Sequence, residues 1–96
     1  MRKATAAGSG LVLRLYIAGE APNSLSAIAN VNAICEAHFP TGYNIEIVDM
    51  LQQPLRALAN GIIVTPTLLR LAPTPVRRLI GNLSDAAQVL LTLVNK

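Results

Sequence analysis

Few side chains of this sequence could carry out chemistry. The chain of 96 residues has a single cysteine, Cys35, and a single histidine, His38. One of each cannot form an internal disulfide or an ordinary zinc site. A nucleophile beside a base, a glycine loop for phosphate and a pair of neighbouring carboxylates are all missing from the sequence. The sequence therefore predicts that the protein is not an enzyme and that it holds no cofactor and no metal.

The polar residues that stand out each favour a structural interpretation. Cys35 falls on the apolar side of a predicted helix, where a thiol is typically buried and unreactive. His38 lies at or beyond the end of that helix, where a cation interacts favourably with the helix dipole. Asp49 closes a predicted strand, where turn or cap hydrogen bonding is favoured. We therefore expect these three residues to support the fold.

The cations of "VRRLIG" offer a different kind of site. Arg77 and Arg78 are adjacent on a predicted strand over Val76–Gly81, so their side chains point to opposite faces. A strand at a sheet edge presents unpaired backbone N–H and C=O groups beside these charges. The charges either protect a solvated edge or bind an acidic protein. The bond before Pro66 is expected to be trans on general grounds.

Alternation and helical spacing predict seven elements. Strands are expected at Leu11–Ala18 and Tyr43–Asp49, because apolar side chains alternate there. Asn23 or Ser24 can cap the helix between them, and Ser84 can cap the last helix. Pro54 begins a short helix that Gly61 ends. The remaining strands are expected in "IIVTPTLLRL" and in "VRRLIG", and the apolar stripe of the last helix is expected to consist of Leu83, Ala87, Leu90, Leu91 and Val94.

The order β-α-β-α-β-β-α predicts an α/β fold. The first strand, helix and strand form a right-handed unit with parallel strands. A four-stranded mixed sheet with helices on both faces is the thioredoxin-like arrangement. In thioredoxin-like proteins the junction after the first strand carries Cys-x-x-Cys, whereas here it reads Gly19 to Asn23 without sulfur.

Composition limits the function further. Residues 11–96 are expected to form a single domain behind a flexible tail at 1–10, with 52% hydrophobic residues to build a core. The formal net charge of +3 is diffuse and the aromatic content is 3%, which argues against nucleic-acid binding. We expect no signal peptide and no membrane helix. The lone cysteine suits a reducing cytoplasm.

Four ordered motifs resemble the KaiB family of bacterial circadian-clock proteins. They are "LRLYIAGEAPNSLSAI", "IEIVDMLQQPLRA", "VTPTLLRL" and "PTPVRRLIGNLSD". The resemblance covers Leu11 to about Val94. It implies a non-catalytic protein that binds KaiC, a hexameric P-loop ATPase, and modulates its activity in a clock or stress-response system. KaiA and a histidine kinase are further possible partners.

The resemblance also carries expectations for single residues. Arg14, Arg70, Arg77 and Arg78 match basic positions of the family and are candidates for contacts with acidic groups of the ATPase. Pro66 matches a proline that is commonly cis in the thioredoxin-like form. Some positions depart from the clock pattern: Glu46 stands where lysine is common, and an acidic cluster is replaced by Leu58, Ala59 and Asn60. These departures weaken the case for KaiA binding.

The family is metamorphic, which leaves a second fold open. The alternative is a KaiB-specific tetramer, whereas the thioredoxin-like form engages KaiC. Thr92 and Val94 replace Gly and Asp of many clock proteins, which favours a continuous last helix. We therefore expect a thioredoxin-like resting state, as a monomer or small homo-oligomer. Two other functions stay open: a redox or glutathione-dependent enzyme, and a KaiB-like sensory domain that acts on a histidine kinase.

Overall fold

The computed structural model describes residues 2–3 and 10–94. Its centre is the parallel pair of β2 (Leu11–Ile17) and β3 (Tyr43–Asp49), joined by α1 (Pro22–His38). All seven residues of β2 are paired with β3, from Leu11 opposite Tyr43 to Ile17 opposite Asp49. The helical connection allows the parallel pairing, because parallel strands need a long crossover. The predicted β-α-β unit is thus confirmed.

The rest of the chain extends this sheet on the other side of β2. Helix α2 (Pro54–Ala59) is followed by β4 (Thr67–Ala72), β5 (Arg77–Ile80) and α3 (Ala86–Val94). Strand β4 runs antiparallel to β2, and β5 runs antiparallel to β4. The thioredoxin-like order of elements and the mixed sheet agree with the prediction, and β5 lies at the sheet edge as expected.

A fifth, very short strand was not predicted. Strand β1 (Arg2–Lys3) pairs antiparallel with β3, so the sheet order is β1-β3-β2-β4-β5. These two residues pair with the otherwise open edge of β3. The rest of the predicted tail, apart from Gly10, lies outside the described residues.

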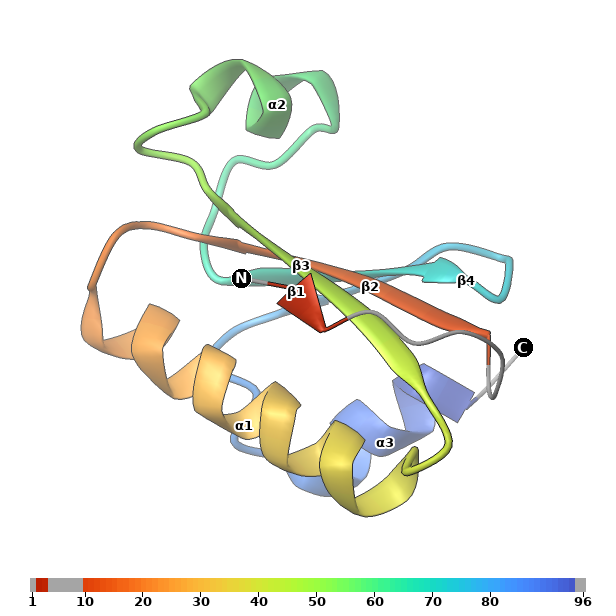
Figure 1. Ribbon diagram of the computed structural model, residues 1–96. Helices are drawn as coiled ribbons and strands as arrows, with labels where there is room; N and C mark the ends of the chain where they lie inside the picture. The colour runs from red at the N-terminus through yellow and green to blue at the C-terminus, as the bar shows by residue number, and fades with distance from the viewer. Residues whose placement is uncertain (1, 4–9, 95–96) are drawn as a thin grey trace.

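Each face of the sheet has its own core. Helices α1 and α3 lie together on one face, and α2 lies on the other side (Figure 1). The odd-numbered residues of β2 face α1 and α3, which explains the alternating leucines. Tyr16 points to the opposite face, into a smaller core with Val48, Ala57, Ile62 and Leu69. No helix in the described part of the chain is long and apolar enough to cross a membrane.

Two helix starts differ from the prediction. Helix α1 begins at Pro22 after Ala21, without a side-chain cap, because proline fits the first helical turn. Ser24 is inside the helix and buried, and its Oγ accepts the N–H of Ala18 at 3.1 Å. In α3 the cap is Asp85, whose Oδ1 accepts the N–H of Gln88 at 3.1 Å, and not Ser84.

The buried face of α3 also differs from the predicted stripe. Val89 and Leu93 are buried, together with Leu83 ahead of the helix, whereas Leu91 and Val94 are more than half exposed. The helix forms over Ala86–Val94 as expected. However, its contact with the sheet runs along the 89–93 side, so Val94 does not lengthen the apolar stripe.

Candidate functional site

The junction after β2 has no redox group and is held by a carboxylate. Oδ1 of Asp49 accepts the backbone N–H of Gly19 at 3.0 Å and that of Leu51 at 2.9 Å. This is the turn role that the sequence predicts for Asp49. A Cβ at Gly19 would lie 3.1 Å from Cδ1 of Leu51, and the residue has a positive φ of 56°. The junction is thus a close-packed connection between two strand ends.

The lone thiol is placed where it cannot react readily. Cys35 is fully buried on the sheet side of α1, as predicted, and burial raises the pKa of its thiol to about 12, with a smaller effect of the Glu36 charge. A thiol with such a pKa carries almost no thiolate at neutral pH. His38 is the last residue of α1, as expected. Among the described side chains, no group of three or more metal-ligating residues could hold a metal ion.

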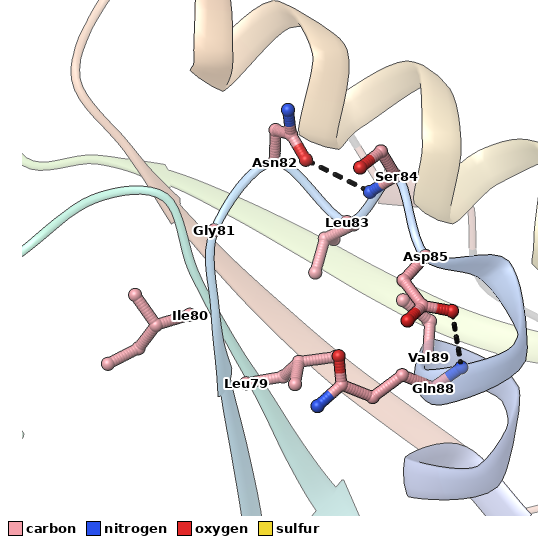
Figure 2. Close-up of a pocket in the computed structure, with 9 residues that line it drawn as sticks. All are labelled: Leu79, Ile80, Gly81, Asn82, Leu83, Ser84, Asp85, Gln88 and Val89. Carbon is pink, nitrogen blue, oxygen red and sulfur yellow. Dashed lines mark hydrogen bonds between the residues drawn. The ribbon is translucent and has the colours of Figure 1, made fainter.

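A shallow pocket of about 140 Å³ lies between β5 and the start of α3. Figure 2 shows that the loop of Asn82, Leu83, Ser84 and Asp85 forms much of its wall. The two polar groups drawn with hydrogen bonds, on Asn82 and Asp85, are used to cap backbone N–H groups. Ligand pockets are usually ~300–1,000 Å³ in volume. The pocket therefore resembles a surface depression more than a substrate site.

Arg14, predicted as a partner contact, belongs to an ionic network on the α2 side of the sheet. Its Nε donates to Oε1 of Glu46 at 3.0 Å, and Nη1 of Arg56 donates to Oε2 of the same carboxylate at 2.8 Å. The Arg56 hydrogen bond, followed by that of Arg14, lowers the pKa of Glu46 to about 2, against the opposing effect of burial. One carboxylate therefore ties α2 to β2 and β3, and Arg14 is already engaged within the protein.

Arg70, predicted as a partner contact, is buried in this fold and does not present its side chain at the surface. The side chain is only 1% exposed, although it lies in β4 next to the edge strand. It donates to backbone oxygens of Thr92 at 3.0 Å, Leu93 at 3.3 Å and Pro75 at 2.8 Å. Burial lowers the pKa of its guanidinium, with a further effect of the nearby Arg77 charge. The residue turns inward because α3 covers this face of the sheet.

Arg77 and Arg78 lie on the edge strand β5, exposed and on opposite faces. Arg77 pairs with Arg70 across the strands, on the α3 side, and Arg78 pairs with Leu69, on the α2 side. Arg78 reaches the loop after α2, where it donates to the oxygens of Gly61 at 3.2 Å and Asn60 at 3.3 Å. The peptide bond before Pro66 is cis, as the resemblance implied, and so are the bonds before Pro73 and Pro75.

One apolar region of the surface was not predicted from the sequence. The segment 51–64 exposes five large apolar side chains, each between 45% and 81% exposed: Leu51, Leu55, Leu58, Ile63 and Val64. We call these five residues the apolar surface. Only Ala57 and Ile62 of the segment enter the core. The sequence did hold a signal, because Leu55 and Leu58 are three residues apart and share one side of a helix. A short helix that turns Ala57 toward the sheet directs Leu55 away from it.

Two arginines lie beside the apolar surface. Arg56 lies within segment 51–64. Arg78 donates hydrogen bonds to the backbone oxygens of Asn60 and Gly61 in the same segment. The acids nearby are occupied: Glu46 binds two arginines, and Asp49 accepts two backbone N–H groups. Large exposed apolar patches typically mark interaction sites on soluble proteins. The surface therefore suits an apolar partner surface that carries carboxylates at its rim.

These features define a thioredoxin-like protein without the thiol pair of the redox members. The family model described as KaiB domain matches residues 14–94, most of the chain. The chain belongs to the KaiB family. This agrees with the four motifs that carried the resemblance.

Relatives in cyanobacteria support the assignment. The chain is 48% identical over 83 residues to "Circadian clock protein KaiB3" of Synechocystis sp., covering 86% of this chain and 81% of that protein. It is 43% identical over 88 residues to "Circadian clock oscillator protein KaiB" of Prochlorococcus marinus, covering 92% and 84%. Both relatives are named as clock proteins and not as enzymes, which agrees with the prediction that the chain is not an enzyme.

Solved structures support the fold. The N-terminal domain of Synechococcus elongatus SasA superposes with a TM-score of 0.74 at 24% identity, covering 98% of this chain and 92% of that chain. The thioredoxin Deadhead of Drosophila melanogaster gives a TM-score of 0.67 at 11% identity, covering 83% and 74%. The thioredoxin-like fold is thus shared with proteins of low sequence identity.

Proposed function

We propose that this protein is a non-catalytic cytoplasmic regulator that binds a KaiC-type hexameric ATPase. The observation that carries the proposal is the apolar surface on segment 51–64, flanked by Arg56 and Arg78. It belongs to a chain whose relatives are named as KaiB clock proteins. The proposal includes the thioredoxin-like packing as the resting, binding-competent state, in a monomer or small homo-oligomer.

The contacts would divide into an apolar centre and a charged rim. Interface energy concentrates in a few large side chains that become desolvated, so Leu55 and Ile63, exposed by 78% and 81%, are the best anchors. Arg78, and to a lesser degree Arg77 on the other face of β5, would attract carboxylates of the partner. Charges at a rim act mainly on the association rate and on its salt dependence. Arg14 would act indirectly, by keeping Glu46 and α2 in place.

The test is binding to a KaiC-type ATPase from the same organism, measured by biolayer interferometry. We expect Leu55→Ser combined with Ile63→Ser to weaken binding more than ~10-fold, since each anchor is worth over ~1 kcal/mol. Arg78→Glu should slow association and reduce its salt dependence. Leu91→Ser is the matched control, because Leu91 is a similarly exposed leucine on α3. Sedimentation of the free protein should give a monomer or small oligomer.

Several outcomes would contradict the proposal. If the wild-type protein does not bind the ATPase, the proposed function is wrong. Equal binding by wild type and the Leu55/Ile63 variant would remove the apolar surface from the interface. A loss with Leu91→Ser as large as that with the double variant would place the interface on α3 instead.

A further inference from the structure

Arg70 is a buried cation whose hydrogen bonds join two separate segments. It lies in β4, 1% exposed. Its Nη1 donates to Thr92 and Leu93 in the last turn of α3, and its Nη2 donates to Pro75 in the connection between β4 and β5. Thr92 and Pro75 lie 22 and 5 residues from Arg70 in the sequence. A single planar group therefore fixes both relative to the sheet.

The helix end explains how a buried charge is tolerated here. The last four carbonyl groups of a helix have no partner within the helix, and they carry a partial negative charge from the helix dipole. Helix α3 has no basic residue in its own last turn. Arg70 supplies from the sheet the cation that the helix sequence does not provide. Its guanidinium is suited to this task because its donors form a rigid fork.

We propose that Arg70 is a positioning residue that latches the end of α3 and the β4–β5 connection together. Loss of the guanidinium leaves carbonyl groups of both segments without their donor, and this destabilises both at once. The packing of the C-terminal third, including the edge strand that carries Arg77 and Arg78, then depends on one buried cation. These hydrogen bonds form within the free protein and require no partner.

Amide hydrogen exchange of the full-length protein tests the latch. In Arg70→Met we expect protection to fall more than ~10-fold at residues 91–94 and 76–80, and much less at Leu13 and Ile45 in the central strands. Arg78→Met is the matched control, because it makes the same change on the same hairpin at an exposed site. It should leave residues 91–94 unchanged. Urea unfolding of each variant measures its global stability. A local loss of amide protection can thus be distinguished from destabilisation of the whole protein.

A second variant distinguishes the latch from ordinary packing. Val94→Lys places a cation at the exposed end of α3, where it can interact with the same carbonyl groups. Combined with Arg70→Met, it should restore protection at 91–94 but not at 76–80. Three results would overturn the proposal. They are no recovery of protection at 91–94 in the double variant, equal recovery at 91–94 and 76–80, and unchanged exchange in Arg70→Met alone.

Discussion

Replacing Glu46 with glutamine should loosen α2 from the sheet, because Glu46 joins Arg56 of α2 to Arg14 of β2. The substitution keeps the size and one acceptor oxygen but removes the charge. Arg14 and Arg56 then face each other without a shared counter-ion. We expect Glu46→Gln to destabilise the protein at pH 7 and to increase hydrogen exchange in segment 51–64.

The magnitude follows from the pKa of Glu46, which the two arginines lower from an ordinary value of 4.5 to about 2. At 1.36 kcal/mol per pH unit, the full difference would correspond to about 3 kcal/mol. The side chain is 37% exposed, so solvent screens the interaction strongly. We therefore expect a loss of about 1–1.5 kcal/mol in the free energy of unfolding. For a domain of this size that lowers Tm by roughly 4–12 °C.

The sign of the pH dependence is fixed by the lowered pKa. The unfolded chain binds a proton at Glu46 near pH 4.5, whereas the folded protein does so only near pH 2. The ionic network therefore contributes its full stabilisation above about pH 5. This stabilisation is lost as the pH falls from 4.5 to about 2. The stability difference between wild type and Glu46→Gln should be constant from pH 7 to pH 5 and should vanish near pH 2.

Urea unfolding followed by circular dichroism, repeated between pH 2 and pH 7, measures this difference. Glu20→Gln is the control, since Glu20 is an exposed carboxylate in the loop after β2 and should change stability by less than ~0.5 kcal/mol. Equal stability of Glu46→Gln and wild type at pH 7 would refute the reasoning. A difference that persists unchanged at pH 2 would show that the effect is not ionic.

Two further predictions concern single side chains. Cys35 is buried, and the pKa of its thiol is raised to about 12. Ellman's reagent at pH 8 should therefore modify the native protein at least ~100-fold more slowly than the urea-unfolded protein. Comparable rates would contradict the burial of the thiol. Asp85→Ala should cost about 1 kcal/mol in thermal or urea unfolding because it removes the cap on the Gln88 N–H, whereas Ser84→Ala should cost less than ~0.5 kcal/mol. The reverse order would show that Ser84 is the cap.

The sequence by itself determined the order of elements and the character of the central strands. Alternating leucines from Leu11 to Ile17 predict a strand covered on both faces, and β2 is central in the sheet. The strand Tyr43–Asp49 was predicted to the residue. The unreactive Cys35 and the turn role of Asp49 were also predictable, because both follow from local position. Motif resemblance supplied the family and the cis bond before Pro66.

The direction of long polar side chains was decided by tertiary structure. Arg70 and Arg78 are both basic residues of one hairpin, and nothing in their local sequence separates them. Arg70 is buried because α3 packs over its face, and Arg78 is exposed because it lies on the edge strand. Similarly, Glu46 and Arg56 meet only because α2 folds back onto the sheet, ten residues away along the chain.

The apolar surface shows the same limit for hydrophobic residues. Leu55 and Leu58 have the composition of core residues, and hydrophobicity alone predicts burial. Whether an apolar side chain is buried depends on what lies opposite it. The smaller core on the α2 side of the sheet includes Ala57 and Ile62 of segment 51–64, and the leucines of that segment remain exposed to solvent. Sequence patterns therefore determine which side chains could be buried, and only the packing of distant elements determines which of them remain available to a partner.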